Sequence, residues 1–231
     1  MVTGAAGAIG SAVAARYAEA GYVVHGWDLT PGTDDRVRWS RLSLTDWPAM
    51  RDAAAASGEI DVVVNLAAAG GGREAALDTP PEAWAAAIDL TLNGSFYLAR
   101  AVFPGLAAAG GGTLVNIASV AASSGFRDRA PYCTGKAGLL ALTRCLAIEW
   151  AEHGVRVLAV SPGFSDTPGM HRGIAEGRSN LDAILAHTPQ RRLITVEELA
   201  AAVYRLSQPE FRALTGSEVL LDGGFVALGG I

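Results

Sequence analysis

A tyrosine and a lysine lie four residues apart in this sequence, at Tyr132 and Lys136. Side chains at this spacing share one face of a helix. An ammonium group beside a phenol stabilises the phenolate, so such a tyrosine can serve as a general acid or base. Among 18 basic residues Lys136 is the only lysine, and a compact ammonium fits a crowded site better than a planar guanidinium does. The pair therefore indicates proton-transfer chemistry more than an ordinary pair on a helix surface.

A hydroxyl group precedes this pair at Ser119, two residues after an apolar run that ends at Ile117. Open α/β sheets bind their ligands beyond the carboxyl ends of the strands. A serine at such a place would, taken alone, cap a loop. With Tyr132 thirteen residues further on, Ser119 becomes a second candidate catalytic residue.

A glycine-rich turn opens the chain, with glycines at positions 4, 7 and 10. Such glycines let the backbone approach a pyrophosphate, and the helix that follows supplies N–H groups and positive partial charge. After this helix a strand ends at Asp28, whose carboxylate can accept bonds from ribose hydroxyls and would repel a 2′-phosphate. The alternative role for Asp28 is to cap the turn after it. Arg36 and Arg38 are close enough in sequence to bind a phosphate, so NADP stays open beside NAD.

A sheet is needed to position these residues. Short apolar runs, typical of buried parallel strands, alternate with alanine-rich helical stretches. The runs cover residues 22–24, 61–64, 113–117, 155–160 and 218–221, and the helical stretches cover roughly residues 8–20, 46–56, 81–109, 130–152 and 195–206. This alternation predicts an α/β fold over residues 1–231, a single Rossmann-type doubly wound parallel sheet with helices on both faces.

The first strand of such a sheet is central, yet the glycine turn leaves only residues 1–3 for it. A strand of three residues lies at the short end of the usual range. Either this strand is short, or the chain begins upstream of Met1.

The composition excludes several classes of protein. With 50% hydrophobic and 18% charged residues the chain is not disordered, and its net charge of −5 argues against sequence-independent nucleic-acid binding. The longest uncharged run, residues 101–126, contains Pro104 and a triple-glycine turn and cannot be one membrane-spanning helix. Cys133 and Cys145 would lie about 18 Å apart along one helix, too far for a disulfide. We expect a cytoplasmic protein with free thiols and assign no metal ligands.

In order and spacing these motifs resemble those of the short-chain dehydrogenase/reductases, and the resemblance covers essentially the whole chain. It rests on residues 3–10, Asn65, Ser119, Tyr132 with Lys136, residues 162–167, and residues 214–216 through 222–224. The family implies a nicotinamide cofactor and hydride transfer between a secondary alcohol and a ketone.

The resemblance also implies roles for the matching residues. Tyr132 would exchange a proton with the substrate oxygen, Ser119 would hydrogen-bond that oxygen, and Lys136 would hold the nicotinamide ribose. Thr167 and the backbone of residues 162–164 would hold the carboxamide. The implied cofactor-binding residues are Gly4, Ala6, Gly7, Ala8, Ile9, Gly10, Asp28, Ser43, Leu44, Asn65, Ala67, Ala68, Tyr132, Lys136, Pro162, Gly163, Phe164 and Thr167. Asp28 makes NAD the expected cofactor, with NADP less favoured.

The chain departs from the family's pattern at three places. Thr91 stands where the family has an asparagine three residues before Gly94, and Asn93 follows two residues later. That asparagine helps to hold a proton-relay water, so the Thr91 hydroxyl would have to take over this catalytic role. Ala68 replaces the usual glycine after the fourth strand and leaves room for a cofactor. Ser43 replaces an acidic residue that contacts adenine, which predicts weaker adenine selectivity.

Substrate recognition is expected in the family's lid region, here about residues 164–192. Arginines gather on this segment and in the loop before Tyr132, although the net charge of the chain is −5. Guanidinium groups favour an anionic substrate, while a solvated lid or a subunit interface is the alternative. Aromatic and methionine side chains would add an apolar wall. The candidate substrate residues are Phe126, Arg127, Arg129, Met170 and Arg172.

We therefore expect an NAD-dependent oxidoreductase that interconverts a secondary alcohol and a ketone on a small molecule. The segments around Asp28 and after Ser161 are loosely similar to dehydrogenases of cyclohexadiene-diol carboxylates, such as 2,3-dihydro-2,3-dihydroxybenzoate, so a cyclic carboxylate-bearing diol is one candidate substrate. A 3-oxoacyl-thioester reductase is an alternative. A catalytically weakened nucleotide-binding sensor or scaffold is another, motivated by Thr91. Family members commonly pair their long helices, so we expect a homodimer or homotetramer, with neither nucleic acid nor membrane as a partner.

Overall fold

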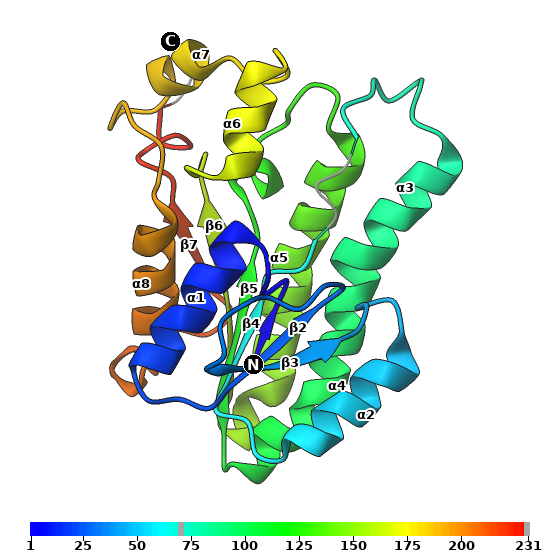
Figure 1. Ribbon diagram of the computed structural model, residues 1–231, viewed down its shortest axis with the longest axis vertical. Helices are drawn as coiled ribbons and strands as arrows, with labels where there is room; N and C mark the ends of the chain where they lie inside the picture. The colour runs from blue at the N-terminus through cyan, green and yellow to red at the C-terminus, as the bar shows by residue number, and fades with distance from the viewer. Residues whose placement is uncertain (69–71, 229–231) are drawn as a thin grey trace.

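The computed structural model describes residues 1–68 and 72–228. Within these residues seven strands form one parallel sheet in the order β3-β2-β1-β4-β5-β6-β7 (Figure 1). The strands are β1 Val2–Thr3, β2 Val24–Asp28, β3 Val37–Arg41, β4 Val62–Asn65, β5 Gly112–Ile117, β6 Val155–Pro162 and β7 Glu218–Leu221. The strand order reverses direction between β1 and β4, the kind of point at which such sheets bind ligands. The doubly wound parallel sheet predicted from the sequence is confirmed.

Helices lie on both faces of this sheet (Figure 1). They are α1 Ala8–Glu19, α2 Trp47–Ser57, α3 Pro81–Ile88, α4 Gly94–Ala108, α5 Ala130–Trp150, α6 Pro168–Ala175, α7 Leu181–Ala186 and α8 Val196–Ser207, with the short helical turns η1 Asp89–Asn93, η2 Val120–Ala122, η3 Ala151–His153 and η4 Pro209–Phe211. α1 and α8 pack against each other on one face, and α2, α4 and α5 contribute to the core on the other.

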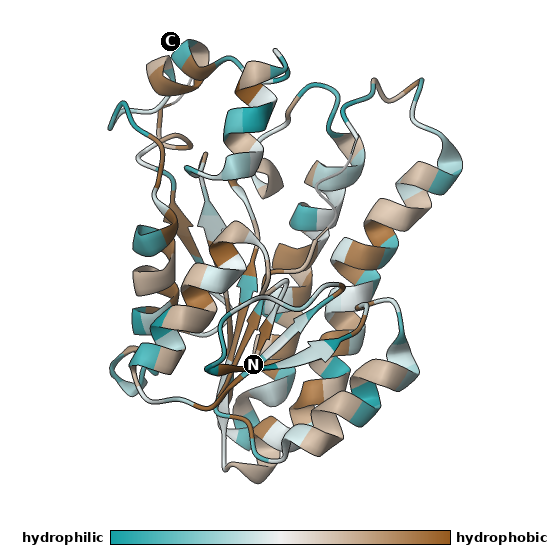
Figure 2. Ribbon diagram, in the orientation of Figure 1, coloured by the Kyte–Doolittle hydropathy of each residue, from teal (hydrophilic) through white to brown (hydrophobic). Residues whose placement is uncertain are grey.

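The central strands supply the core of both faces. Successive side chains of a strand point to opposite faces, and β4 shows this alternation: Val62 and Val64 pack with α1 and α8, whereas Val63 packs with α2 and α4. Figure 2 shows hydrophobic residues concentrated on these central strands. Each fully buried aliphatic side chain contributes about 1.5–3 kcal/mol, so the sheet is a rigid base for the loops at its carboxyl edge.

Two strands differ from the sequence-based expectation. β1 has only two residues, Val2 and Thr3, as the early glycine turn requires. β3 was absent from the predicted runs because its sequence is Val-Arg-Trp-Ser-Arg and only Val37 is fully buried. β3 lies at the edge of the sheet, where one side of the strand faces solvent and polar side chains are tolerated.

The long helix predicted over residues 81–109 is interrupted. α3 ends at Ile88, a π-helical turn (η1) spans Asp89–Asn93, and α4 begins at Gly94. A Cβ on Gly94 would lie 2.9 Å from the Cβ of Leu44, so close packing at this point depends on glycine. π-turns inside helices are frequent at functional sites.

Two short helices, α6 and α7, stand beyond the carboxyl edge of the sheet, inside the segment predicted to be a lid (Figure 1). Cys133 and Cys145 are both on α5 and are free thiols. Among the helices of residues 1–68 and 72–228, none has the length and apolarity needed to cross a bilayer.

Candidate active site

The glycine turn between β1 and α1 has a backbone that depends on glycine at two positions. Gly4 has a φ of +64°, and a Cβ on Gly10 would lie 2.0 Å from the carbonyl oxygen of Gly4. α1 therefore starts close against β1, with Gly7 as an N-cap that has no side chain to bond the first N–H groups. Uncapped N–H groups and the positive end of the helix dipole favour a negatively charged ligand here.

Asp28 ends β2 directly beside this turn. Its Oδ2 accepts a hydrogen bond from the backbone N–H of Ala6 at 3.0 Å, and its Oδ1 accepts one from the N–H of Thr30 at 3.3 Å. The carboxylate thus joins the turn that would hold a pyrophosphate to the strand end where a ribose would lie. Both roles considered for Asp28, capping and ribose binding, are compatible with this position.

A cleft of about 1170 Å³ runs along the glycine turn and the end of β2. Predicted cofactor residues that line it are Gly4, Ala6, Gly7, Ala8, Asp28, Ser43, Leu44, Ala67 and Ala68. Small side chains, helix N–H groups and a carboxylate at the strand end fit the adenosine and pyrophosphate of a dinucleotide. Ile9 and Gly10 lie in the first turn of α1, and the other predicted cofactor residues lie at the ends of β4 and β6 and on α5.

Ser119, Tyr132 and Lys136 come together at the carboxyl end of β5. Ser119 is the N-cap of η2, its Oγ accepts from the N–H of Ala121 at 3.1 Å, and η2 packs against α5. Lys136 lies on α5 and its Nζ donates to the carbonyl oxygen of Ile117 at 2.5 Å. The same Nζ lies 6.0 Å from the centroid of the Tyr132 ring. One ammonium group therefore connects the strand end that precedes Ser119 with the phenol.

Lys136 is only 3% exposed. Burial lowers the pKa of its ammonium to about 8, because desolvation disfavours the charged form. The group is thus still protonated near neutral pH, close to the point at which it can lose its proton.

A buried polar network lies under this site. The Oδ1 of Asn65 accepts from the hydroxyl of Thr3 at 3.2 Å, and its Nδ2 donates to Ser95 Oγ at 2.8 Å and to Asn116 Oδ1 at 3.0 Å. Asn116 in turn donates to Thr143 Oγ1 at 3.0 Å on α5. Asn65 is 2% exposed, so its side chain joins β1, β4, β5 and α4 and does not line the cleft.

Thr91 lies on the π-helical turn η1 and is 1% exposed. A Cβ on Gly135 would lie 3.1 Å from Thr91 Cβ, which places Thr91 against α5 next to Lys136. Asn93 is instead bonded to Oδ1 of Asp89 at 2.6 Å. Of the two residues considered for the position of the family's asparagine, Thr91 is the one that faces the helix of Tyr132 and Lys136.

The end of β6 brings Pro162, Gly163, Phe164 and Thr167 to the same edge of the sheet. The N–H of Gly163 donates to the carbonyl oxygen of Leu221 at 2.9 Å, and a Cβ on Gly163 would lie 2.8 Å from the Cα of Asp222. Thr167 is the N-cap of α6, and its Oγ1 accepts from the N–H of Met170 at 3.2 Å. Within residues 1–68 and 72–228 this hydroxyl donates to no acceptor, so its hydrogen is available to a ligand.

Aromatic side chains from four segments cluster beyond the strand ends. The ring of Phe126 lies 6.0 Å from those of Phe164 and Phe225, which are 5.3 Å from each other, and His187 lies 4.6 Å from Phe225. Phe225 was not among the sequence-based candidates. Phe225 directly follows the Asp-Gly-Gly motif at residues 222–224, a signal that could have drawn attention to it.

The candidate arginines differ in their surroundings. The side chain of Arg127 is 95% exposed and lies 3.8 Å from Asp128, and Arg172 is exposed on α6. The guanidinium of Arg129, by contrast, lies over the Tyr132 ring, 4.5 Å from its centroid. An arginine missed by the sequence analysis, Arg73, donates to the carbonyl oxygen of Arg178 and to the hydroxyl of Ser179.

Comparison with known proteins agrees with this geometry. Residues 45–226 match the family model described as enoyl-(acyl carrier protein) reductase. A cis-4-hydroxycyclohexanecarboxylate dehydrogenase of Sinomonas cyclohexanicum is 33% identical, covering 99% of this chain and 96% of the relative. The chain belongs to the short-chain dehydrogenase/reductase family. As a short-chain dehydrogenase/reductase it is an oxidoreductase that depends on a nicotinamide dinucleotide, as the resemblance implied.

Other members of the short-chain dehydrogenase/reductase family are similarly related. A 2-dehydro-3-deoxy-L-rhamnonate dehydrogenase (NAD(+)) of Sphingomonas sp. (strain SKA58) is 32% identical over 97% of this chain and 93% of its own length. An acetoacetyl-CoA reductase of Cupriavidus necator is 35% identical over 96% of each chain. The solved structure of ElxO with NADP bound has a TM-score of 0.91 over 98% of this chain and 97% of its own, at 23% identity, which is a likeness of fold.

Proposed function

We propose that this protein is an NAD-dependent enzyme that interconverts a secondary alcohol and a ketone. The observation that carries the proposal is the position of Lys136, whose buried Nζ donates to the Ile117 carbonyl and lies 6.0 Å from the centroid of the Tyr132 ring. A bound nicotinamide cofactor would supply the hydride chemistry, as acceptor for the alcohol carbon or as donor for the ketone carbon. Tyr132 takes up or gives back the hydroxyl proton at the substrate oxygen, and Ser119 donates a hydrogen bond to that oxygen.

The supporting residues have matching roles in this proposal. Lys136 holds the nicotinamide ribose and stabilises the Tyr132 phenolate. Thr167 and the backbone around Gly163 hold the carboxamide. Thr91, buried against α5 next to Lys136, supplies a hydroxyl to the proton relay.

The preference for NAD rests on charge at the end of β2. Asp28 would repel a 2′-phosphate. The two arginines considered as binders of that phosphate, Arg36 and Arg38, lie elsewhere. Arg36 is bonded to Asp34 through both Nε at 2.9 Å and Nη2 at 2.6 Å, while Arg38 lines a separate cavity of about 420 Å³ beside Met1. The rhamnonate dehydrogenase relative carries NAD(+) in its name, which supports the same cofactor.

A carboxylate on the substrate is part of the proposal. Two relatives, the hydroxycyclohexanecarboxylate and rhamnonate dehydrogenases, are named for acids, and a cyclic hydroxy acid or carboxylate-bearing diol fits an active site with arginines and aromatic rings. A 3-oxoacyl-thioester reductase is the second candidate, supported by the acetoacetyl-CoA reductase relative.

The first experiment is a titration of the protein with NADH and NADPH, followed by energy transfer from tryptophan. Trp27 and Trp39 line the cleft and would report binding. We expect NADH to bind at least about tenfold more tightly than NADPH, a difference of about 1.4 kcal/mol. Asp28→Ser should reduce the difference between the affinities for NADH and NADPH. Tighter binding of NADPH would contradict the role given to Asp28.

The second experiment tests catalysis with a panel of cyclic hydroxy acids and 3-oxoacyl thioesters. Tyr132→Phe should lower turnover by about 100- to 10,000-fold while NADH binding stays unchanged. Tyr97→Phe, on α4 beside Trp47, is the matched control and should keep full activity. Full turnover by Tyr132→Phe would refute the mechanism, and NADH binding without turnover of any panel member would contradict both proposed substrate classes.

A further inference from the structure

Arg129 occupies a position that helix stability does not explain. It is the N-cap of α5, a helix of 21 residues, yet it makes no side-chain capping bond, and the first turn of α5 contains no acidic residue. Serine, threonine, aspartate and asparagine are preferred at an N-cap, and a cation is unfavourable at the positive end of the helix dipole. A residue that breaks local rules in this way is often there for a functional reason.

The Arg129 guanidinium lies over the ring of Tyr132. It lies 4.5 Å from the centroid of the Tyr132 ring, so its charge is directly beside the proposed proton donor. Among the described residues, the ion pair formed by this loop joins Arg127 to Asp128 and does not include Arg129.

A second guanidinium, that of Arg73 on another loop, is close enough to Arg129 for the two charges to interact. Arg73, after β4, is held by the carbonyl of Arg178 and the hydroxyl of Ser179. Its pKa is lowered by burial and by the nearby charges of Arg129 and Arg178, with Asp128 acting in the opposite direction. Arg178 has its own partner in Glu176. Asp128, the acidic residue whose charge acts on Arg73, is itself paired with Arg127.

An apolar wall continues from this pair. Phe126 is three residues before Arg129 in the same loop, and its ring meets Phe164 and Phe225. A ligand that fills both regions needs an anionic group at one end and an apolar body at the other.

We infer that Arg129, with Arg73 beside it, binds the carboxylate of the substrate and fixes the carbinol carbon against Tyr132. The inference rests on the proposed function and adds the residues that select the substrate class, a hydroxy acid with an apolar carbon skeleton. A bound carboxylate would offset the repulsion between the two guanidiniums and would supply negative charge at the N-terminus of α5. Guanidinium–carboxylate bonds are among the strong hydrogen bonds in proteins.

The test uses ligands that need not react. Binding of cyclohexanecarboxylate and of the neutral cyclohexanecarboxamide to the enzyme–NADH complex is measured by calorimetry. We expect the carboxylate to bind at least about tenfold more tightly than the amide. Arg129→Gln should remove that preference, and Arg73→Gln should reduce it in part. The control is Arg51→Gln on α2, where Arg51 pairs with Asp52. It changes the net charge by the same amount and should leave the preference for the carboxylate over the amide intact.

The outcomes separate this inference from the proposed function. Equal binding of acid and amide, no binding of either to a complex that holds NADH, or full preference in Arg129→Gln would each overturn the inference. A protein that does not bind NADH at all would refute the proposed function instead. Unchanged NADH affinity in Arg129→Gln confirms that the variant is folded.

Discussion

At the scale of single residues, Lys136 is the side chain whose surroundings most change its chemistry. It is the chain's one lysine, it is 3% exposed, and its Nζ donates to a backbone carbonyl at 2.5 Å. A buried ammonium lowers the stability of the fold unless interactions compensate for its lost hydration. Retaining it beside Tyr132 is consistent with a function that outweighs this effect.

This burial predicts how stability depends on pH. The ammonium has a pKa of about 8 in the fold, below its ordinary value of 10.5, so between these values the unfolded chain binds more protons and wild-type stability rises with pH. Lys136→Met lacks the ammonium group, so its free energy of unfolding does not share this rise with pH. Relative to wild type, the free energy of unfolding of Lys136→Met should therefore fall by about 3 kcal/mol from pH 8 to pH 10.5. Urea denaturation at pH 7.5, 9 and 10.5 measures the difference, and a difference independent of pH would contradict the prediction.

The residue scale also shows what spacing along the chain can and cannot reveal. Tyr132 and Lys136 were recognisable because four residues on a helix fix their common face. Arg73 and Phe225 were not, because their proximity to Arg129 and Phe126 arises from loops that the sheet brings together. Asn65 was assigned to the cofactor by resemblance, but its bonds to Thr3, Ser95 and Asn116 hold the strands and α4 together.

The Asn65 network supports a second prediction. Asn65→Ala would leave buried groups on Thr3, Ser95 and Asn116 without their partner, and a buried group left unsatisfied costs about 1–3 kcal/mol. We expect a loss of about 3 kcal/mol in the free energy of unfolding. Asn93→Ala, which removes a bond to Asp89 outside the core, is the control and should lose less than about 1 kcal/mol. Similar losses in both variants would argue against a structural role for the network.

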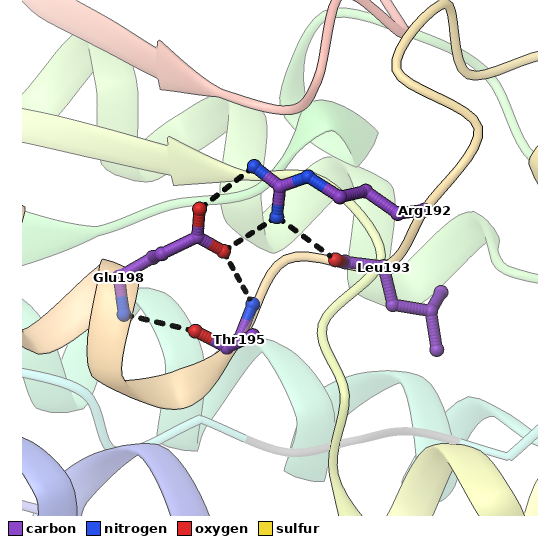
Figure 3. Close-up of polar contacts among 4 residues, drawn as sticks. All are labelled: Arg192, Leu193, Thr195 and Glu198. Atoms are coloured by element: carbon purple, nitrogen blue, oxygen red, sulfur yellow. Dashed lines mark hydrogen bonds and ion pairs between the residues drawn. The ribbon is translucent and has the colours of Figure 1, made fainter.

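At the scale of elements, hydrogen bonds between Thr195 and Glu198 cap the N-terminus of α8. Figure 3 shows Thr195 Oγ1 accepting from the N–H of Glu198 at 3.1 Å, while Glu198 Oε2 accepts from the N–H of Thr195 at 3.0 Å. Arg192 adds bonds to both carboxylate oxygens at 2.6 and 2.7 Å. A capping box is therefore present at residues 195–198, and it also anchors the end of the segment predicted to be a lid to α8.

This cap leads to a third prediction. Thr195→Ala should lower the free energy of unfolding by about 1 kcal/mol. The bonds from Arg192, with a smaller effect from Thr195, lower the pKa of Glu198 to about 2. Because the folded pKa is depressed, the contribution of Glu198 is present above pH 4.5 and is lost as the pH falls toward 2. Glu198→Gln should flatten this acid dependence, whereas Glu197→Gln should not. Thermal unfolding between pH 2 and pH 7 tests both.

Helices with capping residues could be located closely from the sequence, whereas the π-turn and the edge strand could not. α2 and α8 begin within one residue of expectation because Asp46 and Thr195 are capping residues. The π-turn at Asp89–Asn93 depends on tertiary packing, with Gly94 against Leu44 and Gly135 against Thr91. β3 was missed because an edge strand need not be apolar.

At the scale of the whole molecule, apolar side chains remain exposed on the helices that the family commonly pairs. Phe96 on α4 is 45% exposed and Ile148 on α5 is 80% exposed. We expect a dimer or tetramer in solution, and Ile148→Asp combined with Phe96→Arg should shift it toward monomer because charge is unfavourable in an interface core. Leu77→Asp, in a loop and 99% exposed, is the control. Light scattering that finds a monomer in the unmodified protein would contradict the prediction.

The packing of α1 against α8 has a consequence for folding during synthesis. The Tyr17 hydroxyl donates to Ser207 Oγ at 2.7 Å across 190 residues of sequence, and the Tyr204 ring packs on Tyr17 and Tyr22. This half of the core cannot close until the chain beyond residue 207 has left the ribosome. Until α8 emerges, the apolar face of the sheet that α8 covers stays exposed, so chains that end before α8 should aggregate more readily than chains that include it.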